Sequence, residues 1–172
     1  MDPFEVRLAF LDQLSRLTAS QQTIQRAAQF ALNEEELCED LYSCVLEELD
    51  QASINARINL LYTIDALVQP AGRGGFAGYR DQLRPDLVRV IRTVVPEGQL
   101  GAVNLSQTRK VMHTWRRKQL FAEEELAAAE QVLGDRMELH ASNDVAVAQK
   151  LSLSKDEILR RMEEDRERAS WP

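Results

Sequence analysis

Polar side chains recur at helical spacing within an otherwise apolar stretch, residues 53–70. The polar residues are Asn55, Asn59, Tyr62, Asp65 and Gln69. Apolar residues fill most other positions, also three or four apart, and predict one helix that is buried over much of its circumference. Amide, carboxylate and phenol groups can all form hydrogen bonds. Either neighbouring helices pair this polar row internally, or the row forms the floor of a groove that a ligand enters.

Five basic side chains form the one strongly basic patch of the sequence. They are Arg109, Lys110, Arg116, Arg117 and Lys118. No acidic residue lies within residues 109–118, although the chain of 172 residues has a formal net charge of −7 at pH 7. The segment 105–121 is expected to be helical, and the inward residues are expected to be Thr108, Val111, Met112 and Trp115. Lys110, His113 and Arg117 are then spaced to form one stripe on the helix.

The residues that usually carry catalysis or bind metals are few. His113 and His140 are the only histidines, and neither has a cysteine or second histidine at ligand or triad spacing. Cys38 and Cys44 are six residues apart, unsuited to a disulfide within one helix, and their acidic neighbours would raise a thiol pKa. Residues 33–50 hold eight acidic residues without an oxygen-rich turn, which indicates a solvated surface rather than a metal site. We therefore expect a protein that is not an enzyme and needs no metal or cofactor.

The charge balance and hydropathy disfavour several other classes of protein. A net charge of −7 argues against direct binding to nucleic acid or to an anionic membrane. Transmembrane helices need about 18 consecutive apolar residues, and the sequence has no such run. The acidic N-terminus does not resemble a signal peptide, and the two cysteines fit a reduced, intracellular protein.

Caps and apolar periods predict about eight helices, short links and no strand, which is an all-α domain. Asp2, Pro3 and Glu5 predict the first helix start. Its apolar face is expected to hold Phe4, Leu8, Leu11 and Leu14. Later starts are predicted by Thr18 with Gln21, Asn33 with Glu36, Ser53, Tyr79, Glu123 and Ser154. Breaks are predicted at the glycine-rich segment 72–78, at Pro85 and at the turn 96–101.

The chain is expected to divide into two parts. Residues 1–135 form the helical domain. Residues 136–172 form a connection and a final charged helix, which either packs on the domain or leads to further structure.

Two segments together resemble the CTD-interacting domain (CID) family. Residues 60–68 read Leu-Leu-Tyr-Thr-Ile-Asp-Ala-Leu-Val, similar to the Leu-Tyr-x-Ile-Asp-Ser-Ile of the family's central helix. Residues 111–121 hold Val-Met-His-Thr-Trp, basic residues and Leu-Phe, similar to its penultimate core helix. Residues 94–96, Gly101, Asn104 and 154–158 more closely resemble the gamma subunits of fungal kinases that phosphorylate the C-terminal domain (CTD) of RNA polymerase II.

The resemblance implies a right-handed superhelix of about eight helices, as in CID, VHS and ENTH domains. In the family, the second, fourth and seventh helices line a groove for the phosphorylated heptad repeats of the polymerase. Tyr62 and Asp65 match the central-helix positions, where the aspartate hydrogen-bonds the peptide, and a basic residue of the seventh helix can meet a phosphate. The candidate groove residues are Asn55, Asn59, Tyr62, Asp65, Gln69, Lys110, His113 and Arg117.

The resemblance also implies a function, that of a non-catalytic subunit of a cyclin-dependent CTD kinase in the nucleus. Expected partners are the kinase and cyclin subunits, with polymerase heptad repeats as a further candidate. Ala66 replaces the family's usual serine, and Gln69 and Pro70 replace a basic residue and an asparagine, changes that favour assembly over tail binding. The alternatives are a stand-alone CID reader of the phosphorylated tail and a VHS/ENTH-like trafficking adaptor.

Overall fold

The computed structural model describes residues 2–69, 75–136, 157–164 and 166. The chain divides into two units, Met1–Met137 and Glu138–Pro172. The predicted cap at Ser154, the connection over residues 137–152 and the glycine-rich residues 72–74 lie outside the described residues.

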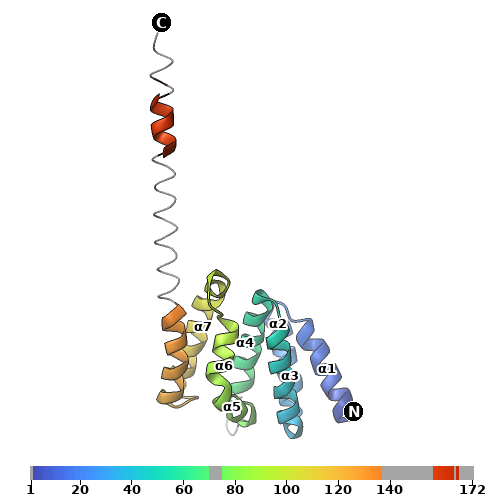
Figure 1. Ribbon diagram of the computed structural model, residues 1–172. Coiled ribbons are helices and arrows are strands. Elements are labelled where there is room, and N and C mark those ends of the chain that lie inside the picture. The colour runs from blue at the N-terminus through green and yellow to red at the C-terminus, as the bar shows by residue number, and fades with distance from the viewer. Residues whose placement is uncertain (1, 70–74, 137–156, 165, 167–172) are drawn as a thin grey trace. The chain divides into compact units, whose positions relative to one another are not determined.

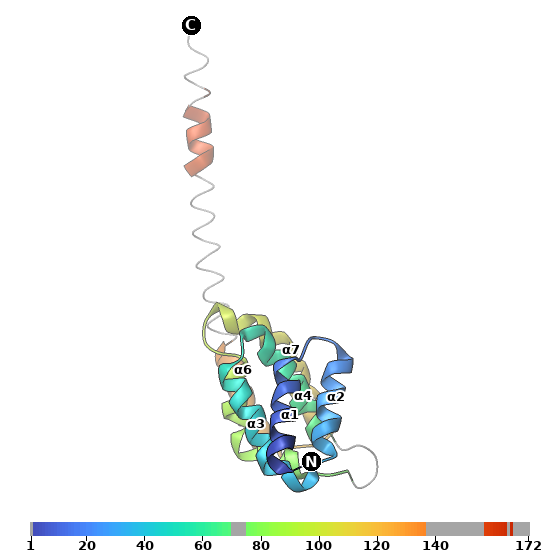
Figure 2. The same cartoon turned by 90° about the vertical axis from the view of Figure 1, so that its right-hand side faces the viewer.

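The first unit is a right-handed superhelix of helices, as predicted, and the part of the chain that the structure describes has no strand. Figures 1 and 2 show the helices side by side, with α1 at one edge of the unit. The elements in chain order are α1 (Pro3–Ser15), α2 (Gln21–Leu32), η1 (Glu35–Leu37), α3 (Cys38–Gln51), α4 (Ile54–Val68), α5 (Gly78–Leu83), η2 (Arg84–Asp86), α6 (Leu87–Val94), α7 (Gln99–Arg117) and a helix over residues 123–136. In the second unit, residues 157–164 are helical.

Helix α4 is the central element of the first unit. It packs mainly against α2 and α7, and it buries Leu60, Leu61, Ile64, Leu67 and Val68. The predicted N-cap is confirmed, because the Ser53 hydroxyl accepts a hydrogen bond from the backbone N–H of Ala56. The apolar period therefore identified the buried helix and its first residue correctly.

The end of α6 and the start of α4 are both joined to α7 by one buried side chain. The Nδ2 of Asn104 donates hydrogen bonds to the carbonyl oxygens of Ile54 and Val94, each over 2.9 Å.

The buried face of α7 also holds Trp115, which is fully buried and packs on Phe121, with ring centroids 5.2 Å apart. The predicted inward face of α7 is confirmed, but the helix begins at Gln99, several residues before the predicted start at 105.

Two of the predicted helix caps are wrong. The cap of α2 is Ser20, whose hydroxyl accepts a hydrogen bond from the backbone N–H of Gln22. Thr18, two residues earlier, instead accepts at its Oγ1 from the backbone N–H of Ser20. Asn33 ends α2 instead of starting α3, and a 3-10 turn separates the two helices. Since asparagine and threonine also favour turns, the sequence pattern alone does not distinguish these roles.

The predicted apolar face of α1 is wrong for Phe4 and Leu8 but correct for Leu14. The first helix start is confirmed, with a capping box between Asp2 and Glu5. The helix, however, buries Val6, Phe10 and Leu14. The side chains of Phe4 and Leu8 are exposed. Packing against α2 and α3 therefore uses a face that is rotated from the predicted one and shares Leu14 with it.

Candidate functional site

The polar row of α4 lies along a cavity between α2 and α4. The cavity has a volume of about 470 Å³. Its lining residues are Ala19, Gln21, Ile24, Gln25, Tyr62, Asp65, Ala66 and Gln69. Asn55 is exposed and Asn59 is half-buried, and both lie outside this cavity. Three of the five α4 residues in the predicted groove, Tyr62, Asp65 and Gln69, therefore share one concave surface.

Side chains of α7 pair with this row on its other side. The Tyr62 hydroxyl donates to Oε1 of Gln107 over 3.1 Å. Oδ1 of Asp65 accepts hydrogen bonds from Nε1 of Trp115 and from Nε2 of Gln69, each over 2.7 Å.

The pairing continues to the end of α7, where Nζ of Lys118 donates to Oε1 of Gln69. A chain of polar contacts thus runs from Trp115 through Asp65 and Gln69 to Lys118. The alternative in which neighbouring helices satisfy the polar row therefore holds for much of its length. Partial burial also raises the pKa of Tyr62, which keeps the phenol protonated as a hydrogen-bond donor.

The basic patch is divided by the fold. Arg116 is bound by two carboxylates of the helix over residues 123–136, since its Nη2 lies 2.7 Å from Oε1 of Glu123 and it also pairs with Glu130. These hydrogen bonds, that to Glu130 foremost, raise the pKa of Arg116. Lys110 and Arg117 are exposed. Lys110 lies one turn after Gln107 on α7, close to the side that meets Tyr62.

His113 is not part of the same surface as Tyr62. It lines a different cavity, of about 340 Å³, between α7 and the helix over residues 123–136. Its neighbours there include Arg109, Arg116 and Glu130. The predicted stripe of Lys110, His113 and Arg117 therefore does not form a single wall of the α2–α4 groove, and a binding role for its members stays a prediction.

Three residues at the groove were not among the predicted site residues. Gln107, Trp115 and Lys118 make the contacts with α4. Trp115 was expected only as a core residue and Lys118 only as a member of the basic patch. Counting the helical period of α7 in both directions from Trp115 places Gln107 and Lys118 near the buried stripe, but it does not indicate which helix they meet.

The two cysteines occupy the core, as expected. Cys38 and Cys44 are free and buried. Burial, followed by the nearby carboxylate of Glu39, raises the pKa of Cys38 to about 11. Such a thiol is a poor nucleophile at neutral pH.

Two further classes of site are absent from the part of the chain that the structure describes. Its residues contain no group of histidine, cysteine, aspartate and glutamate side chains arranged to hold a metal ion. None of its helices has the length and apolar character needed to cross a membrane.

Several known proteins are similar to this chain in fold. The chain superimposes on the structure titled "Structure of a non-canonical CID of Ctk3" with a TM-score of 0.74 and 36% identity, covering 79% of this chain and 98% of the other. The CTD-interacting domain of Seb1 from S. pombe gives a TM-score of 0.65 at 16% identity, over 80% of this chain and 99% of that one. The yeast Nrd1 CID, in complex with Sen1 NIM3, gives a TM-score of 0.57 at 17% identity, over 76% of this chain and 98% of that one. At these low identities, the last two comparisons show the fold alone.

The sequence comparisons are more specific. A curated protein of Schizosaccharomyces pombe, "CTD kinase subunit gamma", is 37% identical over 169 residues, which covers 98% of this chain and 77% of that protein. Residues 1–122 match the family described as "CTD kinase subunit gamma CTK3". The chain therefore belongs to the CTD kinase subunit gamma family.

Proposed function

We propose that this chain is a non-catalytic subunit of a nuclear cyclin-dependent kinase that phosphorylates the CTD of RNA polymerase II. In this proposal its helical domain supports assembly of the kinase and cyclin subunits. Membership of the gamma-subunit family supports the association with such a kinase. The internal pairing of the groove supports assembly over direct reading of the polymerase tail.

The observation that carries this choice is the bonding of Asp65. In related domains this aspartate hydrogen-bonds a peptide, whereas here Oδ1 of Asp65 accepts hydrogen bonds from both Trp115 and Gln69. Tyr62 is likewise engaged by Gln107. A tail peptide that bonded through Oδ1 of Asp65, or that accepted from the Tyr62 hydroxyl, would have to replace these bonds, and exchanging one hydrogen bond for another yields little net free energy.

The side chain of Ala66 adds to this effect. It lines the cavity without a hydroxyl group, so the groove has one hydrogen-bonding partner fewer than the typical family member. Lys110 and Arg117 are exposed positive charges on α7. Charge alone raises the rate at which a peptide meets the domain more than it gives tight, specific binding.

Reconstitution tests the assembly role. The full chain would be coexpressed with a kinase subunit and a cyclin subunit, and the complex would be followed by size-exclusion chromatography and by kinase activity on a heptad-repeat substrate. We expect the three proteins to elute together and the activity to fall when this chain is omitted. Separate elution of this chain, with unchanged kinase activity, would contradict the proposal.

Titration with labelled heptad peptides, phosphorylated and unphosphorylated, tests the groove separately. We expect no saturable binding at concentrations up to about 1 mM, which corresponds to about −4 kcal/mol. The matched variant is Lys110→Glu with Arg117→Glu, which reverses both exposed charges. Micromolar binding of the phosphorylated peptide that this variant abolishes would show that the domain reads the tail instead.

A further inference from the structure

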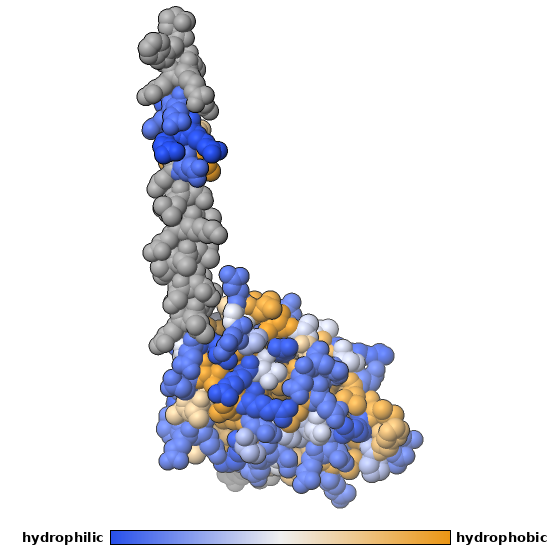
Figure 3. Space-filling model, in the orientation of Figure 1, coloured by the Kyte–Doolittle hydropathy of each residue, from blue (hydrophilic) through white to orange (hydrophobic). Residues whose placement is uncertain are grey.

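Helix α1 exposes an apolar stripe that the core of the domain covers only at its Leu11 end. Phe4 is 66% exposed and Leu8 is 51% exposed, one helical turn apart on the outer side of the helix. Leu11 continues the stripe and is half-buried. We call Phe4, Leu8 and Leu11 the α1 stripe. Figure 3 shows apolar surface gathered over this edge of the unit.

The inner face of α1 is already complete without these residues. Val6, Phe10 and Leu14 are buried there. Phe10 stacks on Phe30 of α2, with ring centroids 6.0 Å apart. Single exposed apolar residues are ordinary on protein surfaces. A phenylalanine and a leucine four residues apart lie on the same side of a helix. This spacing is typical of helices that contact a partner helix.

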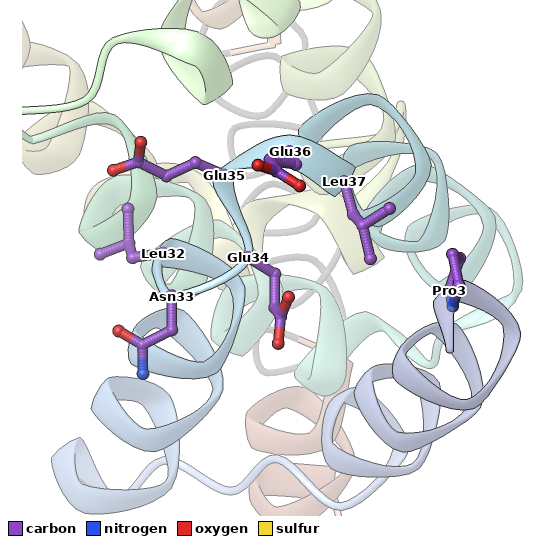
Figure 4. A pocket seen from close by; sticks show the side chains of 7 residues that line it. All are labelled: Pro3, Leu32, Asn33, Glu34, Glu35, Glu36 and Leu37. Carbon is purple, nitrogen blue, oxygen red and sulfur yellow. The ribbon is translucent and has the colours of Figure 1, made fainter. Parts of the chain in front are cut away.

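Carboxylates flank the stripe on the side of α3 and of the turn before it. A cavity of about 630 Å³ lies between Pro3, in the first turn of α1, and the corner that holds Glu34 and Glu36. Figure 4 shows the carboxylates of Glu34 and Glu36 on the side of this corner toward Pro3, with Glu35 pointing away. Along α3, Glu47 meets α1 through Arg7, whose Nη2 lies 2.6 Å from its Oε1.

These carboxylates are poorly neutralised. Among the described residues, Glu34, Glu36 and Asp40 form no ion pair, whereas Glu47 pairs with Arg7 and Asp50, at the far end of α3, pairs with Arg89. The surface therefore combines an apolar stripe with a flank of negative charge. Its complement is a helix with an apolar face and lysine or arginine beside that face.

We propose that the α1 stripe and its acidic flank dock a basic amphipathic helix of a partner protein. This inference concerns a surface separate from the α2–α4 groove, and it does not depend on the kinase assignment. A second copy of the same face is a poor occupant, because a two-fold contact would bring the same carboxylates against one another. An anionic membrane is disfavoured for the same electrostatic reason.

Two synthetic amphipathic peptides with the same leucine stripe serve as probes. One has lysine beside the stripe and the other has glutamate. Binding to the full chain would be measured by fluorescence anisotropy at low and at high NaCl. We expect the lysine peptide to bind, to weaken as salt screens the charges, and to exceed the glutamate peptide in affinity by at least about tenfold.

The decisive variant is Phe4→Glu with Leu8→Glu. Both side chains are exposed, so the fold should survive, which circular dichroism would verify. The added negative charge by itself strengthens attraction for a lysine peptide. A loss of affinity of about tenfold or more would therefore come from the lost apolar contact.

The matched control is Leu100→Glu with Val103→Glu. These residues are 67% and 60% exposed at the start of α7, and the variant makes the same change in charge. We expect it to bind the lysine peptide as the wild type does. A second variant, Glu34→Gln with Glu36→Gln, should weaken binding and reduce its salt dependence.

Three results would overturn the inference. The first is an equal loss of affinity in the α1 and α7 variants, which would mean that the loss does not come from the α1 stripe. The second is equal affinity for the lysine and glutamate peptides. The third is concentration-dependent self-association of the wild type, measured by sedimentation, that the α1 variant abolishes, because the occupant would then be a second copy of this chain.

Discussion

The indole Nε1 of Trp115 donates a hydrogen bond to Oδ1 of Asp65 across 2.7 Å, between residues fifty positions apart in the chain. Trp115 is fully buried, so this carboxylate is the acceptor that allows its polar N–H group to lie in the core. The aspartate that marks the predicted groove is therefore also part of what joins α4 to α7.

Replacing Asp65 with alanine should destabilise the domain. The Trp115 N–H would lose its acceptor in a buried place, which costs about 1–3 kcal/mol. Asp65→Asn keeps an oxygen at the same position and should cost less. Urea unfolding followed by tryptophan fluorescence measures both. Equal stability of wild type and Asp65→Ala would show that the hydrogen bond contributes nothing to the free energy of unfolding. A loss of binding in an Asp65 variant counts as an effect on the groove only if the variant is still folded by this measurement.

Removing the charge of Arg116 should loosen the contact between α7 and the helix over residues 123–136. Arg116 pairs with Glu123 and Glu130 on that helix. For Arg116→Met we expect a lower urea midpoint than for the wild type, and the difference should shrink by about half or more in 1 M NaCl because salt screens exposed charges. Arg117→Met is the control, since Arg117 is exposed and outside this pair. A difference independent of salt would mean that packing, and not charge, explains the effect.

Stability should decline at alkaline pH through Cys38. Burial raises its pKa from 9.0 to about 11, so the folded thiol holds its proton over a range where the unfolded thiol loses it. The folded state then binds more protons than the unfolded state, and its stability falls as pH rises from about 9 toward 11. Below pH 9 this contribution is complete and constant. The measurement is urea unfolding of wild type and Cys38→Ala across this range.

The comparison of the two proteins isolates the thiol from the tyrosines, which also titrate in alkali. The difference in unfolding free energy between wild type and Cys38→Ala should change above pH 9 and stay flat below it. A difference that is constant across the whole range would contradict the raised pKa.

Two glycine substitutions should have opposite effects. A Cβ at Gly101 would lie 1.8 Å from the carbonyl oxygen of Pro96, a contact with backbone that cannot move easily. Gly101→Ala should therefore destabilise the domain by about 1–3 kcal/mol through overpacking.

Gly134 lies in the helix over residues 123–136 with no atom within 4 Å of its added Cβ, so Gly134→Ala should stabilise the domain by about 0.5–1 kcal/mol. Thermal unfolding of the two variants checks both, and a stable Gly101→Ala would contradict the close approach.

Much of the fold could be predicted from local pattern. The buried stripe of α4 and its cap at Ser53 follow from helical period and from hydroxyl chemistry, which act within a few residues. The break at Pro85 separates α5 from α6, because proline does not continue a helix. The caps at Thr18 and Asn33 were wrong because these side chains serve turns as well as helix starts.

The candidate site was predictable on one side only. The polar row of α4 could be predicted because its members lie on one helix and share its period. The side chains of α7 that meet the row, Gln107 and Lys118, could not, because their pairing depends on how two distant helices lie against each other. His113 has the right spacing from Lys110, yet it faces another helix.

By itself, the sequence determined that the domain is helical, which residues of α4 and α7 are apolar, and the family to which the chain belongs. The tertiary structure alone decided which apolar residues of α1 are buried, and with which partners Asp65 and Arg116 bond. The physical reason is one of range. Helical period and caps depend on neighbours three or four residues away, whereas the choice of a face depends on the shape and charge of segments that come together only in the folded chain.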